Sequence, residues 1–231
     1  FQIGDKTGQT VDLSIKSIGT TGLGLGAGVG ATSTTGARAA LGVEIAEGDV
    51  KINGQAVGAI ASTDDIEAVL KAINDNVDNV VASAHNVVVA KVKGSGVVGD
   101  GQFDIKVKEY GVGTATDFNI SAAGSMKELV ANINRETGGV VAASINNEGK
   151  LVLSNDSGAT ITVDDSSATS SAAGYTGGTG FGGTSEEAFE GFITLKSTDG
   201  TAITVERGNL SDTTPGTEAM MESLGFRETT S

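Results

Sequence analysis

Cysteine and tryptophan are absent from this chain, and proline and histidine each occur once. Without cysteine, the fold has no disulfide bonds, no thiolate nucleophile and few ways to build a structural zinc site. Glycine, by contrast, accounts for 35 of the 231 residues. A glycine-rich chain with almost no proline differs from collagen and from proline-rich linkers, and it is typical of short strands joined by many turns.

Basic residues are also scarce: 15 Lys and Arg stand against 29 Asp and Glu, which gives a formal net charge of −14. An acidic surface repels nucleic acids and anionic lipids, so neither is an expected partner. The chain contains no apolar run that approaches the roughly 18 residues of a membrane span. The composition therefore favours a protein that carries its function on an acidic surface and binds neither DNA nor a bilayer.

Two hairpins are predicted from alternating apolar residues. One covers residues 1–15, and the other covers residues 43–57 with Asn53-Gly54 at its turn, a pair that accepts the positive φ angles of tight hairpins. Between them, residues 22–36 are rich in Gly, Ala and Thr and show little periodicity. We predict that this stretch is an irregular linker.

A helix is predicted where apolar residues recur with helical spacing at Ile66, Val69, Leu70 and Ile73. Ser62 and Asp65 approximate an N-terminal capping box, and Asn74 suits the left-handed position that ends a helix. Two strands, over residues 80–84 and 87–92, are predicted to follow.

The same pattern recurs 60 residues later, which indicates an internal duplication. Leu129, Val130 and Ile133 repeat the helix, and Ser125 with Glu128 repeats the capping box. Strands are predicted at residues 150–154 and 159–163, and a shift of 42 residues gives a further echo at residues 193–205. A last short helix is predicted at residues 217–224. The repeated motif comprises Ile73, Asn74, Val80, Val81 and Ala82 in the first copy, and Ile133, Asn134, Val140, Val141 and Ala142 in the second.

The predicted fold class is α+β, with small antiparallel sheets and hairpins, one short amphipathic helix on each, and a duplicated unit. We divide the chain into five segments by composition and pattern. They are a hairpin and Gly-rich arm (residues 1–40), a first repeat unit (41–96), a second repeat unit (97–165), a flexible Ser/Gly loop (166–184), and a returning hairpin, short helix and tail (185–231).

The repeated motif resembles the IN repeat, named for its Ile-Asn pair, in the variable regions of bacterial flagellins. Residues 49–54, 73–74 and 80–82 resemble one copy, and residues 133–134, 140–142 and 149–154 resemble a second. The opening Phe1-Gln2-Ile3-Gly4, with residues 8–11 and 23–25, is similar to the hairpin that ends the filament-forming part of a flagellin. The closing Leu224-Gly225-Phe226 is similar to the stretch before the C-terminal helices of flagellins.

This resemblance implies a structural subunit of the extracellular flagellar filament, whose outer domains support motility and carry antigenic surface. The implied partners are other flagellin subunits, bound through terminal helices absent from this sequence, and antibodies. It implies no enzymatic activity and no cofactor. A chain without those helices is expected to be monomeric, and its first and last segments are expected to lie close together.

Other interpretations remain open. A filament-cap protein of the flagellum carries similar repeats. A cell-surface adhesin domain that binds carbohydrate would favour aromatic platforms, but the chain has only two Tyr and no Trp. A hydrolase is disfavoured because it would depend on His85 alone, which is better interpreted as a core or edge residue than as a base or metal ligand.

The remaining motifs are weak as ligand sites. The glycine-rich residues 22–28 lack the strand–loop–helix context of a phosphate loop. The acidic pairs at residues 64–65, 164–165 and 186–187 lack the alternating spacing of a calcium loop, so no metal is predicted. The resemblance makes O-glycosylation one hypothesis for a Ser/Thr cluster, with an unmodified loop as the alternative: Ser166, Ser167, Thr169, Ser170 and Ser171.

Overall fold

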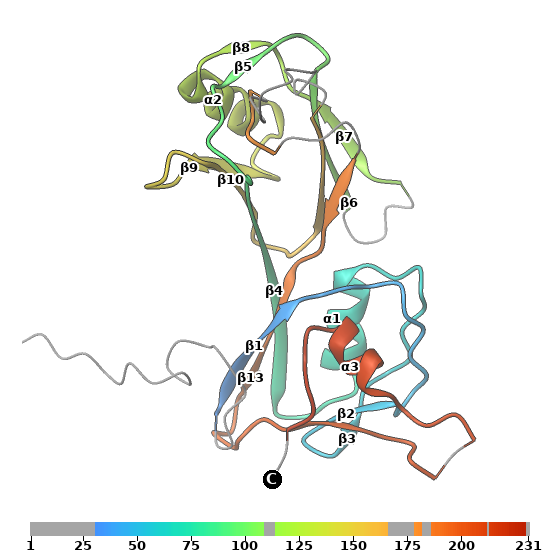
Figure 1. Ribbon diagram of the computed structural model, residues 1–231. Helices are drawn as coiled ribbons and strands as arrows, with labels where there is room; N and C mark the ends of the chain where they lie inside the picture. The colour runs from blue at the N-terminus through green and yellow to red at the C-terminus, as the bar shows by residue number, and fades with distance from the viewer. Residues whose placement is uncertain (1–30, 109–113, 166–177, 182–185, 212, 230–231) are drawn as a thin grey trace, which may run out of the picture.

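The computed structural model describes residues 31–108, 114–165, 178–181, 186–211 and 213–229. Figure 1 shows two lobes joined by long antiparallel strands. The lower lobe in this view contains β1 (Ser33–Arg38), β2 (Val50–Ile52), β3 (Gln55–Ala56), α1 (Ile66–Asn74), the first part of β4 (Val80–Val89), β13 (Phe192–Ser197), β14 (Val205–Arg207) and α3 (Glu218–Ser223).

The upper lobe contains the second part of β4 and most of the intervening chain (Figure 1). Its elements are β5 (Val97–Val98), β6 (Phe103–Lys108), β7 (Thr116–Asn119), β8 (Ala123–Gly124), α2 (Met126–Glu136), β9 (Ala142–Ile145), β10 (Leu151–Asn155), β11 (Thr160–Asp165) and β12 (Glu187–Phe189). Mixed helices and small antiparallel sheets confirm the predicted α+β class.

Four antiparallel sheets organise these elements. A five-stranded sheet in the order β1-β13-β4-β10-β9 runs through both lobes, because β13 pairs with the first part of β4 and β10 pairs with its second part. The other sheets have the orders β12-β11-β6-β7, β14-β2-β3 and β5-β8. No described helix is long and apolar enough to cross a membrane.

Strand β4 contributes to two separate apolar cores. Alternate residues along its whole length are buried, as expected for a strand with one face inward. Val80, Ala82 and Ala84 belong to the core of the lower lobe, and Val88 belongs to the core of the upper lobe. The division between the cores therefore falls inside one continuous strand, where two strands had been predicted.

The topology of one lobe repeats that of the other. In the upper lobe, β6, β7, α2, β9, β10 and β11 follow one another along the chain, and we call these elements the continuous unit. In the lower lobe the equivalents are β2, β3, α1, the first part of β4, β13 and β14, and we call these the split unit. Matching pairs face each other across the ladders: Ala82 with Leu195 and Ala143 with Leu153; Ile52 with Val205 and Ile105 with Val163.

The echo at residues 193–205 is therefore the second half of the split unit, and the continuous unit lies inside the β4–β13 connection. The returning segment also supplies Ile193, Leu195, Ile203 and Val205 to the core of the split unit. The predicted closeness of the first and last segments holds for the described residues, because the N–H of Ala37 donates to the C=O of Gly225 at 2.7 Å.

Local predictions have mixed outcomes. The helix over Ile66–Asn74 and the Asn53-Gly54 turn are confirmed, with φ angles of 50° and 74° at the turn. The N-cap of α1 is Asp65, whose carboxylate accepts from the N–H of Ala68, so Ser62 was wrong as the cap. Residues 33–36 are part of strand β1 and not linker, while the predicted hairpin over residues 1–15 lies outside the described residues.

Candidate functional site

The Ile-Asn pair places one buried side chain and one hydrogen-bonding side chain at the end of each helix. Ile73 and Ile133 are fully buried, one in each core. The next residue, Asn74 or Asn134, points to the strand that follows. The prediction that Asn74 takes a left-handed cap position was wrong: Asn74 is the last helical residue, and the C-cap is Asp75.

Each asparagine binds both backbone groups of one strand residue. The Oδ1 atom of Asn74 accepts from the N–H of Ala82 at 2.8 Å, and its Nδ2 donates to the C=O of Ala82 at 3.0 Å. Asn134 makes the same two bonds to Ala143, at 2.7 and 3.0 Å. A primary carboxamide thus occupies the place that a neighbouring strand would take. We call each arrangement an asparagine clamp.

The clamps correct the register of the predicted repeat. The bonded alanine lies eight residues after Asn74 but nine residues after Asn134, because α2 is two residues longer than α1. Ala143, and not Ala142, is therefore the structural equivalent of Ala82. Burial agrees: Val80 and Val141 are buried, Val81 and Ala142 are exposed, and Val140 is only partly buried.

The two helices begin with side-chain caps, but the second has the fuller arrangement. The hydroxyl of Ser125 accepts from the N–H of Glu128 at 3.3 Å, and the Glu128 carboxylate accepts from the N–H of Gly124 at 2.9 Å. The reciprocal bond therefore reaches the residue before the cap, a small variation on the predicted capping box.

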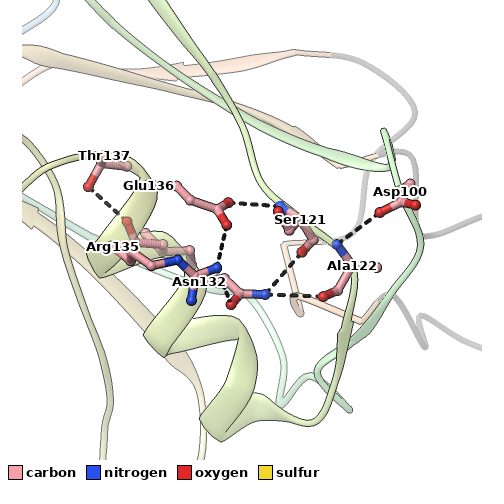
Figure 2. A network of polar contacts seen from close by, with 8 residues as sticks. Asp100, Ser121, Ala122, Asn132, Arg135, Glu136 and Thr137 are labelled. Atoms are coloured by element: carbon pink, nitrogen blue, oxygen red, sulfur yellow. Dashed lines mark hydrogen bonds and ion pairs between the residues drawn. The ribbon is translucent and has the colours of Figure 1, made fainter.

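A polar network attaches the segment before β8 to helix α2 (Figure 2). Asn132 donates through Nδ2 to the C=O groups of Ser121 and Ala122, at 3.2 and 3.1 Å. Glu136 accepts from the N–H of Ser121 at 2.8 Å and forms an ion pair with Arg135. Burial acts to raise the pKa of Glu136, but these hydrogen bonds and the neighbouring guanidinium outweigh it and lower the pKa below its usual range.

The split unit has a backbone contact at the corresponding position. Sixty residues before Asn132 stands Ala72, whose C=O accepts from the N–H of Gly58 at 3.2 Å. The continuous unit thus secures its helix with several side chains, whereas the split unit brings the chain against its helix directly.

The junction between the units is built around Asn86, a fully buried polar residue of β4. Its Nδ2 donates to the C=O of Ala159 at 2.9 Å and to that of Phe189 at 2.7 Å, and its Oδ1 accepts from Arg38 at 2.8 Å. These bonds satisfy the amide and connect β1, β4 and the segments that flank β11 and β13. A buried amide with all its partners present fixes a single arrangement, because any displacement would leave it unpaired.

Arg38 reinforces the junction from the end of β1. Its guanidinium donates to the C=O of Val87 at 2.6 Å and to the C=O of Glu190, and it lies 4.6 Å from the ring centroid of Phe192. Burial lowers the pKa of Arg38, and the Glu190 carboxylate acts in the opposite direction. An arginine remains charged under these conditions, so the contact with the ring is a cation–π interaction.

Two glycines allow the units to approach closely. A Cβ atom on Gly158, which has a φ of 80°, would lie 2.4 Å from the Cβ of Ala84. A Cβ on Gly191 would lie 2.4 Å from the C=O oxygen of Gly158. Packing this close leaves no space for any side chain, so the junction depends on glycine at both positions.

The other candidate residues do not form a site. His85 lies on the exposed face of β4 and stacks on Phe192 at 5.4 Å, which matches an edge histidine. Within the described part of the chain, no group of three or more His, Asp or Glu side chains is arranged to hold a metal ion. Ser166, Ser167, Thr169, Ser170 and Ser171 lie outside the described residues, so their glycosylation stays a prediction.

The junction had no signal in the sequence. Arg38 and Asn86 are isolated polar residues, and their partners lie far away along the chain. The equivalence of Asn86 with Asn146 gave no guidance, because the Asn146 side chain instead accepts from the N–H groups of Glu148 and Lys150 within a turn.

Comparison with known proteins gives one sequence match and several remote structural ones. No curated protein matches the chain in sequence. The flagellar cap protein FliD from Helicobacter pylori has 12% identity and a TM-score of 0.30, with 85% of this chain and 78% of that chain covered. The D2-D3 domains of FliD from Escherichia coli have 18% identity and a TM-score of 0.30, with 76% of this chain and 97% of that chain covered.

The sequence match is to the flagellin hook IN motif, over residues 97–157. This range covers nearly all of the continuous unit, including helix α2, the Asn134 clamp and strand β10. The match identifies residues 97–157 as a flagellin hook IN motif, and it supports a flagellin-like variable region in a structural protein related to the flagellar filament.

Proposed function

We propose that this chain is the surface-exposed outer region of a bacterial flagellin, a structural subunit of the extracellular filament. The observation that carries the proposal is the flagellin hook IN motif at residues 97–157. The asparagine clamp of that motif recurs in the split unit at Asn74. Two units of this kind, one nested in the other, suit a chain segment whose work is to project and to present surface.

The mechanism is mechanical and colloidal. Strand β4 passes unbroken from one core to the other, and the junction at Arg38 and Asn86 links the strands around it. The two units thus act as one spacer. A net charge of −14 keeps neighbouring filaments apart and in solution. The exposed faces supply the antigenic surface.

The partners follow from this role. Other flagellin subunits would bind through terminal helical segments distinct from the residues described here, and antibodies would bind the outer faces. We propose that the chain of 231 residues is monomeric by itself, has no enzymatic activity and needs no cofactor. Sedimentation at increasing protein concentration tests the first point, since pelletable filaments formed by this chain alone would contradict it.

Immunogold electron microscopy of the source bacterium, with antibody raised against this chain, tests the proposed position. Gold along the whole filament is the expected result. Gold restricted to the filament tip would replace the proposal with a cap protein, and gold on the cell body would replace it with a surface adhesin. Intact mass of the native protein tests the glycosylation of Ser166–Ser171 separately, because a mass equal to that of the bare chain would exclude it.

A further inference from the structure

A groove of about 570 Å³ lies between the two units. One wall is helix α1 of the split unit, with Leu70 and Asn74, and the other is the turn after β10 of the continuous unit, with Asp156 and Ser157. The floor is the edge of strand β4 around Ala84. The groove exists only because the units are held against each other, so it is a property of the nested pair and not of a single unit.

The floor of the groove presents one backbone N–H and one C=O that the fold leaves open. Alternate residues of a strand direct these groups to the same edge. At this edge, Ala82 is bound by Asn74 and Asn86 pairs with Asn155, the last residue of β10. Ala84 lies between them and faces the same side, beyond the end of β10. Its two backbone groups therefore point into the groove.

The neighbouring clamp shows which chemical group fits such a pair. The carboxamide of Asn74 accepts from one N–H and donates to one C=O of the same residue. Only a primary carboxamide can do both, because the N–H and C=O of an ordinary trans peptide point in opposite directions. The matching ligand at Ala84 is an Asn or Gln side chain.

Charge around the groove indicates the rest of the partner. Three carboxylates line it, from Glu67, Asp75 and Asp156, against the single ammonium of Lys71, which forms an ion pair with Asp75. The chain as a whole carries a net charge of −14, so a second copy would be repelled. A basic partner is attracted to both the groove and its surroundings.

We propose that this groove is a docking site for a basic polypeptide of another protein, which inserts an Asn or Gln side chain against Ala84 and places a Lys or Arg beside Asp156. The half-buried side chain of Leu70 covers the methylene groups of the inserted residue. The site is independent of the position of the chain in the filament, since it depends only on the contact between the two units.

Backbone amide NMR of the full chain, titrated with the peptide acetyl-Gly-Gln-Lys-Gly-amide, tests the site. The Ala84 amide should shift and saturate at peptide concentrations of about 1–10 mM, the affinity range of a contact this small. Asp156→Lys should weaken binding about fivefold or more, since it replaces an attractive charge with a repulsive one. Replacing Gln by Leu in the peptide should abolish the saturable shift.

Glu44→Lys is the matched control, because it makes the same charge change at an exposed residue outside the lining of the groove. It should bind the Gln peptide nearly as well as the parent chain does. The proposal is overturned if the Ala84 amide does not move, if the Leu peptide shifts it equally, or if Asp156→Lys and Glu44→Lys weaken binding to the same extent.

Discussion

The split unit and the continuous unit share a topology but differ in how the chain assembles them. All strands of the continuous unit lie between residues 103 and 165, whereas the split unit collects β2, β3, α1 and β4 from one part of the chain and β13 and β14 from another. The continuous unit can form from contacts within its own segment. The split unit must close across the inserted unit, and a longer closure costs more conformational entropy.

Separating the two units is the most severe way to test this comparison. A chain of residues 86–191 keeps the second part of β4 and the whole continuous unit, so we expect it to fold alone. A chain truncated after residue 191 loses Ile193, Leu195, Val205 and Met221 from the first core and should lose all structure in the split unit. Amide hydrogen exchange of both pieces checks this, and an unfolded 86–191 piece would show that the continuous unit depends on the split one.

Charged substitutions on the two helices should differ in severity. Leu129 is fully buried in α2, whereas Leu70 in α1 is only partly buried and lines the groove. We expect Leu129→Asp to unfold the continuous unit, a loss of more than about 4 kcal/mol, and Leu70→Asp to leave a folded split unit of reduced stability. Thermal unfolding followed by circular dichroism measures both. Equal losses would mean that the helices are packed alike.

The junction can be weakened without altering either core. Gly158→Ala should cost about 2–4 kcal/mol, because its positive φ is strained and its new methyl group collides with Ala84. Gly54→Ala is the matched control, since Gly54 has a φ of 74° but nothing within 4 Å of the new Cβ. Urea unfolding should show the larger loss for Gly158→Ala. The same loss for both variants would reduce the effect to backbone strain.

The asparagine clamps should matter equally in the two units. Asn74→Ala and Asn134→Ala each remove two hydrogen bonds to one strand residue, so each should cost about 1–2 kcal/mol. Asn146→Ala, which alters an asparagine of a turn, serves as a comparison. Stability is measured by urea unfolding with residue-resolved NMR. A loss confined to Asn134 would mean that only the continuous unit depends on its clamp.

The smallest expected effect is electrostatic and specific to the continuous unit. Burial and the neighbouring Asp117 and Asp164 raise the pKa of Asp104, and its Oδ1 has no hydrogen-bond partner. The folded state then binds a proton more readily than the unfolded state, so this group destabilises the fold at neutral pH and the penalty fades as pH falls through the raised pKa. Asp104→Asn should raise the melting temperature at pH 7, with little difference near pH 3 or below.

Asp199 of the split unit changes with pH in the opposite direction. Hydrogen bonds from Thr201 and Ser197 lower the pKa of Asp199 to about 2. A carboxylate with a lowered pKa stabilises the fold above its unfolded value near 4 and loses that contribution as the pH falls toward 2. Acid should therefore weaken the β13–β14 turn of the split unit while it relieves Asp104 of the continuous unit. A melting temperature of Asp104→Asn that equals the parent value at pH 7 would contradict this contrast.

Much of the repeat was visible in the sequence because it consists of local patterns. The helical spacing of Ile66 to Ile73, the Ser125 cap and the Asn53-Gly54 turn all depend on neighbouring residues. Two shifts, of 60 and 42 residues, revealed the related segments. They did not reveal that residues 193–205 complete the split unit, because the pairing of Leu195 with Ala82 leaves no mark on residues close in sequence.

The features that were missed depend on distant contacts. Strand β1 contains Ser, Thr and Gly with no apolar alternation, and it is a strand because it pairs with β13. Ser62 was chosen over Asp65 as a cap because both fit the local pattern. The asparagine of the Ile-Asn pair was interpreted as a helix terminator, since its strand partner could be recognised only when the helix and strand were seen together.

The position of the continuous unit has a consequence for how such chains evolve. It enters and leaves the split unit at adjacent residues, because His85 at the end of the paired part of β4 faces Phe192 at the start of β13. A copy of the unit could therefore be inserted at a hairpin tip without shifting any strand of its host. The continuous unit has the same hairpin, with β9 and β10 joined by the short turn at residues 146–150. That turn is an acceptor for another insertion, so lineages can lengthen the projection step by step, generation within generation, while the oldest unit at the base stays unchanged.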